Sequence, residues 1–439
     1  MTVQNDFLES LKSIGSQPGL ERLNSKLGLE RIRFLLDKSG IRWEDIPVVH
    51  IAGTNGKGSV VNFISEILYE SNYKVGIYIS PHLIDIYERI KIGHKNISSK
   101  DFDRILLELK SYCQEAEKLG NIGNPTFFEV LTAISIIYFT EKEVDVIVSE
   151  VGLGGRLDAT NVLNGKAVAI TNISLDHQEI LGNSKEEILG EKAGIIKKGS
   201  SVSSCVDLEL ASLLEKICIE KEASLKLFTR DFDITEKSTS FEGSVFDYRS
   251  SNNQFNDIKI RMIGKHQITN AACAISLAES LSYFGLNQIT EESIRKGLEK
   301  SIWPGRFQIL KKSPMIIVDV AHNPAGAKSL SETYNILFND SNTLLLVGIS
   351  QDKDIDGILK EFSKISKRIV LTTIPPRCSN IGTLEKKARK YFTEICSFED
   401  PLKAYDYCMS NLKKRDKLLI TGSIYIAGYI LKGRKLLGS

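Results

Sequence analysis

The segment 46–59 reads IPVVHIAGTNGKGS and sets the architecture of the N-terminal part. Its first half, Ile46–Ala52, is apolar and largely β-branched, which predicts a buried strand. Gly53–Gly56 interrupt this run, and beyond them apolar residues recur at helical spacing. These apolar residues are Val60, Phe63, Ile64, Ile67 and Leu68. The sequence therefore predicts a strand, a glycine-rich loop and a helix in direct succession.

This context is the one that a phosphate-binding loop requires. Glycines let backbone N–H groups approach phosphate oxygens, and the helix N-terminus adds a favourable partial charge. Lys57 supplies a cation and Ser59 a hydroxyl for Mg²⁺. The general pattern G-x-x-x-x-G-K-[ST] is not met, because Ile51 replaces its first glycine and Gly58 follows the lysine. A glycine-rich turn without a ligand is the alternative, which the strand–loop–helix context disfavours.

Further apolar runs predict more strands of the same sheet. They are Lys74–Ile79, Val144–Val148 and Ala167–Thr171. Such runs, separated by helical stretches, indicate a parallel sheet that is covered on both faces. Alternation in Ser238–Phe246 and Asn256–Met262 predicts a small antiparallel addition. Helices are expected over Val130–Thr140, Gln267–Tyr283 and Glu291–Leu298.

The strand pattern then restarts, which predicts a second α/β domain. Its four strand candidates are Met315–Val320, Thr343–Val347, Arg368–Thr372 and Lys417–Thr421. Trp303-Pro304-Gly305 breaks the helical pattern before them. We therefore expect an α/β protein with domains at 1–302 and 303–439, the first with a mostly parallel sheet and the second smaller.

Composition narrows the class of protein. Lys plus Arg is 57 and Asp plus Glu is 55, a net charge of +2 that gives no reason to expect nucleic acid or a membrane as partner. Seven scattered cysteines without a C-x-x-C indicate reduced thiols in a cytoplasmic protein. The N-terminus lacks the features of a signal peptide. The run Val130–Thr140 is too short to span a bilayer.

Polar motifs follow several of the predicted strands. Glu150 follows Val144–Val148 and is placed to hold Mg²⁺ near the phosphate loop, although a solvated carboxylate is the simpler alternative. Asp176 and His177 follow the next strand; such a pair is usually a surface or capping pair, and His177 needs partners to bind a metal. On periodicity alone, Lys192 is an ordinary helix lysine.

Two motifs flank the expected domain boundary. Trp303-Pro304-Gly305-Arg306 offers a guanidinium on a rigid turn, and Asp319-Val320-Ala321-His322-Asn323-Pro324 lies between a strand and a helix. An Arg and an Asp/His pair that reach across a cleft are suited to grip a nucleotide from the second domain. The segment His266–Ala272 opens a helix.

Taken in order, these motifs resemble the bacterial folylpolyglutamate synthases and dihydrofolate synthases of the Mur ligase superfamily. The resemblance runs from about His50 to the C-terminus. It rests on the segments His50–Ser59, Ser80–Leu83, Glu88–Ile90, Thr126–Glu129, Glu150–Asn161, Leu175–His177, Lys192–Ile195, His266–Asn270, Trp303–Arg306, Asp319–Asn323 and Asp352–Asp354.

The resemblance implies roles for individual residues in an N-terminal P-loop ATPase domain and a C-terminal Rossmann-like domain. ATP is expected to contact Thr54, Asn55, Gly56, Lys57, Gly58, Ser59, Asn270, Arg306 and Asp319. Mg²⁺, as one or two ions, is expected at Ser59, Ser80, Glu150, His177 and Lys192, the last as a carbamate. The pterin substrate is expected at Thr126, Phe127, Phe128, Glu129, Leu157, Asp158 and Ala159. Catalysis is expected to depend on Lys57, Lys192 and His322, with His322 near the transferred phosphate. No role follows for Asp352–Asp354.

The activity that the resemblance implies is an ATP-dependent ligation. ATP phosphorylates a substrate carboxylate, and the amine of L-glutamate attacks the acyl phosphate. The expected partners are ATP, L-glutamate and dihydropteroate or folates, in a monomeric protein. The pterin-side matches favour a bifunctional dihydrofolate synthase/folylpolyglutamate synthase.

Three alternatives stay open at this point. The first is a single activity within the family, either that of a monofunctional folylpolyglutamate synthase or glutamylation of dihydropteroate alone. The second is a Mur ligase of cell-wall synthesis; these usually carry an additional N-terminal domain, and only 52 residues precede Gly53. The third is a nucleotide switch that binds ATP without ligation, which the motifs of the second domain disfavour.

Overall fold

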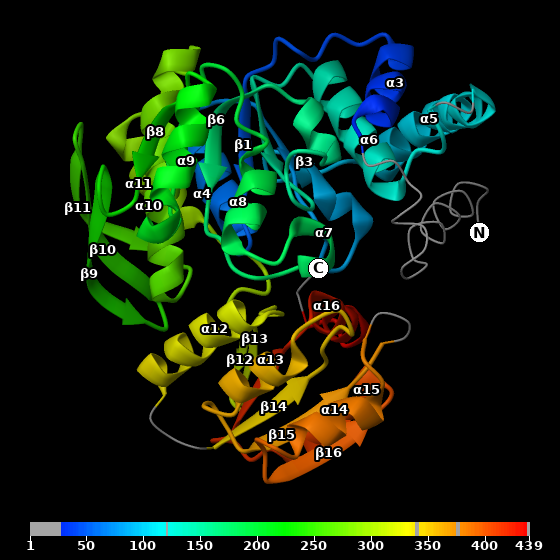
Figure 1. Cartoon of the computed structure of the whole chain (residues 1–439). Helices are drawn as coiled ribbons and strands as arrows, with labels where there is room; N and C mark the ends of the chain where they lie inside the picture. Colours follow the sequence, from blue (N-terminus) through cyan, green and yellow to red (C-terminus); the bar gives the residue numbers. More distant parts are fainter. Residues whose placement is uncertain (1–27, 120–121, 339–341, 375–377, 437–439) are drawn as a thin grey trace.

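The computed structural model describes residues 28–119, 122–338, 342–374 and 378–436, and these form two α/β parts with separate central sheets (Figure 1). The N-terminal part holds an eight-stranded sheet and a three-stranded sheet, and the C-terminal part a six-stranded sheet. No helix in the described part of the chain has the length and apolarity that crossing a membrane requires.

The eight-stranded sheet has the order β4-β3-β2-β5-β1-β6-β7-β8. Its strands are β1 (Val48–Ala52), β2 (Val75–Tyr78), β3 (Ile90–Ile92), β4 (Lys95–Asn96), β5 (Val146–Glu150), β6 (Gly165–Ile170), β7 (Ser201–Ser204) and β8 (Ser224–Leu227). At one edge β3 pairs antiparallel with both β2 and β4, and the other described pairings of this sheet are parallel. The expected mostly parallel sheet is confirmed, while β7 and β8 were not predicted because their sequences are largely polar.

Helices cover both faces of this sheet. In β1, Val49 and Ile51 join a core with α4 (Lys57–Glu70), α10 (Lys265–Leu281) and α11 (Glu291–Lys300). Val48 joins the core of the opposite face, which contains helices α3 (Glu30–Ser39), α5 (Ser99–Leu119) and α6 (Phe127–Glu141). Since successive side chains point to opposite faces, a strand buried on both sides is apolar throughout. A third core lies under α8 (Lys185–Ala193) and α9 (Leu208–Glu220).

A small antiparallel sheet packs on α10, as expected, but one predicted strand was wrong. The strands are β9 (Phe232–Ser240), β10 (Gly243–Ser250) and β11 (Gln254–Ile260). The predicted strand Ser238–Phe246 spans the end of β9, a turn and the start of β10. Alternation continues across such a tight hairpin, so the pattern did not show the turn; Gly243, with φ +131°, was the available signal.

The C-terminal sheet has the order β12-β13-β17-β14-β15-β16. Its strands are β12 (Gln308–Lys312), β13 (Met315–Val318), β14 (Thr343–Val347), β15 (Arg368–Thr372), β16 (Glu394–Phe398) and β17 (Lys417–Thr421). Its helices are α12 (Pro324–Leu337), α13 (Ile355–Phe362), α14 (Ile381–Ala388), α15 (Pro401–Asn411) and α16 (Ile424–Gly433). All four predicted strands are confirmed; the edge strands β12 and β16 were missed because they are only partly buried.

Four short helices complete the described chain. They are η1 (Ile86–Arg89), η2 (Ala159–Val162), α7 (Gln178–Leu181) and η3 (Ser282–Phe284). Figure 1 shows α7 on the side of the N-terminal part that faces the C-terminal part.

Candidate active site

Four neighbouring parallel strands bring the N-terminal motifs to one edge of the sheet. In the order β2-β5-β1-β6, they lead into Ser80, Glu150, the loop Gly53–Gly56 and the segment Thr171–His177. Ligands of open α/β sheets bind outside the carboxyl ends of the strands. Motifs that lie far apart in the sequence therefore converge here because of strand order.

The glycine-rich loop joins β1 to α4 as predicted. Gly53 and Gly56 have φ values of +147° and +85°, which glycine adopts without strain. The backbone of Asn55 is held from β6: its N–H donates to Asn172 Oδ1 at 3.0 Å, and its carbonyl accepts from Thr171 Oγ1 at 2.6 Å. The loop is thus a fixed structure at the start of a buried helix.

Two buried lysines converge on this loop. The Nζ atoms of Lys57 and Lys192 donate to the carbonyl oxygen of Gly53 at 3.1 and 3.0 Å. Burial lowers the pKa of both amines, opposed at Lys57 by Glu150 and Asp176 and reinforced at Lys192 by Lys57. The pKa of Lys192 falls to about 7, so a large fraction of this amine is neutral near neutral pH. Lys192 lies in a helix, as periodicity suggested, but its burial and lowered pKa make it more than an ordinary helix lysine.

Glu150 is the last residue of β5 rather than a residue beyond it, and its carboxylate faces Ser80. Glu150 Oε2 accepts from the Ser80 backbone N–H at 3.2 Å. Burial raises the pKa of Glu150, and the nearby Lys57 opposes the shift. The side chain is 6% exposed, so the alternative of a solvated surface carboxylate is wrong.

His177 lies at the N-cap of α7, next to Asp176. Residues of the C-terminal part reach both side chains: Lys353 Nζ lies 3.1 Å from His177 Nε2 and 2.6 Å from Asp176 Oδ1. Asn323 Nδ2 donates to Asp176 Oδ2 at 3.0 Å. Burial opposes ionisation of Asp176, but the Lys353 and His177 charges and the hydrogen bonds from Lys353 and Asn323 together outweigh burial and lower the pKa of this carboxyl well below its usual range.

The residues expected to contact nucleotide come from both domains. A Cβ atom on Gly56 would lie 2.5 Å from Asn270 Oδ1, so Asn270 lies against the phosphate loop. Asp319 Oδ2 and Oδ1 accept from the backbone N–H groups of Phe307 and Ala321, at 2.9 and 2.8 Å. Asp319 therefore shapes the turn that carries Arg306. The Arg306 Nε is buried without a hydrogen-bond partner in the described structure.

His322 is a neutral imidazole of defined tautomer. Its Nδ1 lies 2.9 Å from the carbonyl oxygen of Val320, which can only accept, so Nδ1 carries the hydrogen. Burial lowers the pKa of His322 to about 4. The Nε2 lone pair is consequently unprotonated at neutral pH.

The residues expected to contact the pterin gather around the N-terminus of α6. Thr126 and Glu129 form a capping box, and the Glu129 carboxylate also accepts from Arg31 Nε at 3.0 Å. Phe127, Phe128 and Ala159 belong to one apolar cluster. The geometry gives Thr126 and Glu129 structural partners of their own, whereas the phenylalanine rings are only partly buried.

Asp158 is held by its own loop. Its Oδ2 accepts from the Leu153 N–H at 2.9 Å and its Oδ1 from the Thr160 N–H at 3.0 Å. The Thr160 hydroxyl in turn contacts His50 Nε2 at 2.9 Å. Gly152 lies under the Phe128 ring, because a Cβ there would meet that ring at 2.5 Å. Leu157 is half-buried on the same loop.

Comparison with known proteins identifies the family of this chain. Residues 51–278 match the Mur ligase middle domain, and residues 305–424 match the glutamate ligase domain of Mur ligases. The dihydrofolate synthase/folylpolyglutamate synthase of Bacillus subtilis (strain 168) is 34% identical over 95% of this chain and 97% of its own. The chain belongs to the folylpolyglutamate synthase/dihydrofolate synthase family of Mur ligases. It is an ATP-dependent ligase that forms amide bonds.

Solved structures of this family share the whole architecture. The folylpolyglutamate synthase of Thermotoga maritima is 35% identical, with a TM-score of 0.82 over 98% of this chain and 97% of its own. Escherichia coli FolC in complex with DHPP and ADP is 28% identical, with a TM-score of 0.86 over 100% of this chain and 99% of its own.

The donor set at the strand ends suits Mg²⁺ in a Mur ligase. Among the described residues, no group of three or more His, Cys, Asp and Glu side chains forms a ready metal site. Mg²⁺, however, usually keeps several waters and binds one or two carboxylates together with substrate phosphates. The Glu150 carboxylate, at the strand end beside the phosphate loop, fits that requirement, and its contact of 3.2 Å with the Ser80 backbone N–H places Ser80 next to it.

Asn323, Lys353 and Asp176 lie in sequence motifs from which no role for them was predicted. The structure brings these three side chains together in the candidate site. Asn323 and Lys353 from the C-terminal domain both contact Asp176 of the N-terminal domain. The available signal was their position in the segments Asp319–Asn323 and Asp352–Asp354. Which side chain each of them meets depends on how the two domains pack.

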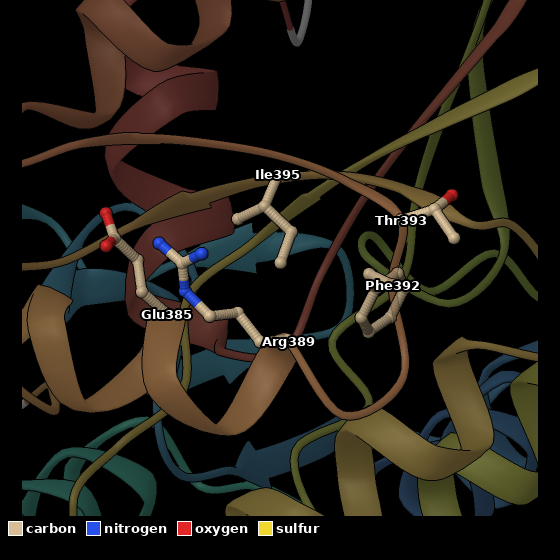
Figure 2. A pocket seen from close by; sticks show the side chains of 5 residues that line it. All are labelled: Glu385, Arg389, Phe392, Thr393 and Ile395. Atoms are coloured by element: carbon tan, nitrogen blue, oxygen red, sulfur yellow. The ribbon is translucent and has the colours of Figure 1, made fainter.

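A cavity of about 390 Å³ lies elsewhere in the ligase, at the edge of the C-terminal sheet (Figure 2). Figure 2 shows Glu385 and Arg389 from the α14 segment, and Phe392, Thr393 and Ile395 from the segment around β16. None of these residues belongs to the motifs that surround the phosphate loop, so this cavity is not part of the candidate site.

Proposed function

We propose that this protein adds L-glutamate to dihydropteroate and to tetrahydrofolates, as a bifunctional dihydrofolate synthase/folylpolyglutamate synthase. The observation that carries the proposal is the similarity through both domains, over 95% of the chain and 97% of the Bacillus subtilis relative. The phosphate loop, the pterin-side segment and the C-terminal motifs are therefore all included. A relative named only folylpolyglutamate synthase, from Lacticaseibacillus casei, is 30% identical, which makes the narrower activity the second candidate.

The reaction needs activation of a carboxylate. Carboxylate is a poor electrophile because its leaving group would be oxide, and transfer of the ATP γ-phosphoryl group turns that leaving group into phosphate. The amine of glutamate then attacks the acyl phosphate and forms the amide. No side-chain nucleophile is required, so positioning and electrostatic stabilisation supply the catalysis.

We assign the nucleotide to the phosphate loop and to the residues that face it. The loop N–H groups and the Lys57 ammonium hold the phosphates, and an ammonium freed from Gly53 O reaches them by a side-chain rotation. Asn270, Arg306 and Asp319 hold the nucleotide from the two domains. The other residues that we propose to contact the nucleotide are Thr54, Asn55, Gly56, Gly58 and Ser59.

The residues proposed to hold Mg²⁺ are Ser59, Ser80, Glu150 and His177, with Lys192 as a carbamate beside a second ion. When bound, the metal offsets negative charge on the phosphates. Carbamate formation needs a neutral amine, and the pKa of about 7 at Lys192 supplies one. The carbamate would replace a buried cation with an anionic oxygen ligand.

His322 is proposed to act near the transferred phosphate through its free Nε2. Because its Nδ1 hydrogen is engaged by Val320, the ring presents an acceptor and not a second donor. An acceptor in this position suits the proton that leaves the glutamate amine.

The pterin is proposed to lie between the start of α6 and the loop before η2. Phe127 and Phe128 offer partly buried rings there, and Asp158 offers a carboxylate in a buried loop. The proposed contacts also include Thr126, Glu129, Leu157 and Ala159. Thr126 and Glu129 act through the shape of the helix terminus, because their side chains bind each other and Arg31.

Oligomeric state, domain boundary and cellular compartment are also part of the proposal. We infer a monomer with a domain boundary at 302/303, just before the turn that carries Arg306. All seven cysteines are free thiols, which suits a reducing compartment, and we propose the cytoplasm.

The decisive experiment is phosphate release from Mg-ATP and L-glutamate, with products identified by mass. Purified protein is compared with dihydropteroate and with tetrahydrofolate as acceptor. Turnover with both acceptors supports the bifunctional enzyme, and turnover with tetrahydrofolate alone supports the narrower one. Absence of product with either acceptor, from folded protein that binds ATP, overturns the proposed substrate.

A further inference from the structure

Asn323 uses one polar atom of its side chain within its own domain and the other to reach the N-terminal domain. Its Oδ1 caps α12 by accepting from the Gly326 N–H at 2.8 Å. Its Nδ2 donates to Asn55 Oδ1 and to Asp176 Oδ2, both at 3.0 Å. The side chain is 2% exposed, so the contact excludes water. One amide group thus connects a helix of the C-terminal domain with both the phosphate loop and the segment after β6.

Lys353 makes the second connection from the C-terminal domain. It lies in the loop between β14 and α13, and its Nζ contacts Asp176 Oδ1 at 2.6 Å. The side chains of Lys353 and Asp176 are only 8% and 10% exposed. Both carboxylate oxygens of Asp176 are therefore occupied from the other domain, Oδ1 by Lys353 and Oδ2 by Asn323.

A buried ion pair of this kind depends on both partners. Loss of one partner leaves an uncompensated charge, which is strongly destabilising for the arrangement that buries it. Separation of the domains would instead return both charges to water. The pair therefore acts on the equilibrium between closed and open arrangements more than on the folding of either domain.

We propose that Asn323 and Lys353 form a latch on Asp176 that holds the cleft closed and, through Asn55, positions the phosphate loop. These are positioning residues; the nucleotide contacts remain those assigned above. The kinetic consequence rests on the proposed ATP-dependent function, whereas the conformational consequence does not.

The first test is small-angle X-ray scattering of the full chain without ligands. Lys353→Met keeps the length of the side chain and removes its charge, so we expect a larger radius of gyration than in the wild type. Lys364→Met is the matched control, because Lys364 pairs with Glu361 on the same domain and is 51% exposed. Equal radii for wild type and Lys353→Met, with or without an ATP analogue, would overturn the latch.

The second test separates a positioning role from a catalytic one. A smaller closed population reduces apparent affinity for ATP by the same fraction. We expect Lys353→Met to raise the KM for ATP by about tenfold or more, while kcat at saturating ATP stays within about threefold. A fall in kcat at unchanged KM and unchanged radius would assign Lys353 to the reaction itself and contradict the proposal.

The third test exchanges the amide of residue 323 and the carboxylate of residue 176. Recovery in the double variant distinguishes loss of the latch from misfolding. Asn323→Asp keeps the helix cap but places a carboxylate against Asp176, so we expect an open cleft. Adding Asp176→Asn supplies an amide donor at 176 and restores a hydrogen bond across the interface. Recovery of compactness in the double variant supports the latch, and a double variant as open as Asn323→Asp refutes it.

The results also separate the latch from the proposed function. Glutamylation by a wild type whose variants scatter identically would leave the ligase assignment intact and remove the latch. Variants that open as expected, in a protein that glutamylates neither acceptor, would keep the latch and remove the proposed substrate.

Discussion

At the scale of single residues, the phosphate loop brings two amines into one buried place. Lys57 and Lys192 both donate to Gly53 O, and within the described part of the chain no carboxylate makes a hydrogen bond with either amine. Like charges at short range and burial both disfavour protonation. An arrangement of this kind is unfavourable for the isolated protein. It suits a site that receives the negative charge of phosphates, and of the carbamate that a neutral Lys192 amine would form with carbon dioxide on loss of a proton.

Lys57→Ala is expected to reduce product formation by at least about 100-fold, because it removes the cation that we propose to hold the phosphates. The measurement is phosphate release at saturating ATP and glutamate. Lys300→Ala is the control, since Lys300 pairs with Glu70 at the far end of α4 and is 58% exposed. Near-normal turnover by Lys57→Ala in a folded protein would contradict the phosphate-loop assignment.

Lys192→Ala is expected to lose most activity and to recover part of it when short carboxylic acids are added. An added carboxylate can take the place of the missing carbamate, whereas it cannot replace an ammonium. The measurement is turnover with and without acetate or formate. A fully active Lys192→Ala protein rules out the carbamate role.

In buffer depleted of carbon dioxide, Lys192→Met is expected to have a higher free energy of unfolding than the wild type. The size of this difference is expected to depend on pH. The folded pKa is about 7 against an ordinary value of 10.5, so the unfolded chain binds the extra proton between these values. The contribution of Lys192 to the free energy of unfolding of the wild type therefore becomes more favourable as the pH rises from about 7 to 10.5. Urea unfolding should show the advantage of Lys192→Met greatest at pH 7 or below and shrinking towards pH 10.

At the scale of elements, the helix that begins at the phosphate loop is held by close helix packing. A Cβ on Gly297 of α11 would lie 2.6 Å from the backbone of Ile67 in α4. The two helices approach this closely only because residue 297 lacks a side chain. The position of α4, and with it of Lys57 and Ser59, depends on this contact.

Gly297→Ala is expected to destabilise the fold by about 1–3 kcal/mol through overpacking. Gly190→Ala in α8 is the matched control, because nothing lies within 4 Å of its added Cβ. In a helix interior that substitution is expected to stabilise by about 0.5–1 kcal/mol. Urea unfolding of both variants gives the comparison, and equal shifts would contradict the packing argument.

At the scale of the whole molecule, the candidate site belongs to neither domain alone. The N-terminal strands supply the phosphate loop, Glu150 and His177, and the C-terminal domain supplies Asp319 and His322. Closure of the two domains over the proposed site would shield an acyl phosphate from water. The two-domain organisation is therefore part of the chemistry.

Asp319→Ala is expected mainly to raise the KM for ATP, because Asp319 holds the turn that carries Arg306 through the Phe307 N–H. The rise expected on loss of a charged hydrogen bond of about 1.5–3 kcal/mol is roughly tenfold to a hundredfold. Asp356→Ala, which removes a partly exposed carboxylate paired with Lys387 and Lys390, is the control. An unchanged KM for ATP would count against a nucleotide contact.

Local pattern by itself determined much of this protein. The run Ile46–Ala52 followed by glycines specified strand, loop and helix, and β14, β15 and β17 were predicted with the bounds that the structure has. These features depend on periodicity and on the special conformations of glycine, which are properties of neighbouring residues. Partly buried edge strands such as β12 and β16 were not predicted, because their side chains face both solvent and core.

Only the tertiary structure decided which motif residues meet and what state they are in. On periodicity Lys192 is an ordinary helix lysine, yet packing buries it on Gly53 and lowers the pKa of its amine to about 7. Asn323 and Lys353 find Asp176 only through the docking of one domain on the other. Burial and electrostatic coupling arise between segments far apart in the chain, and for that reason local sequence does not encode them visibly.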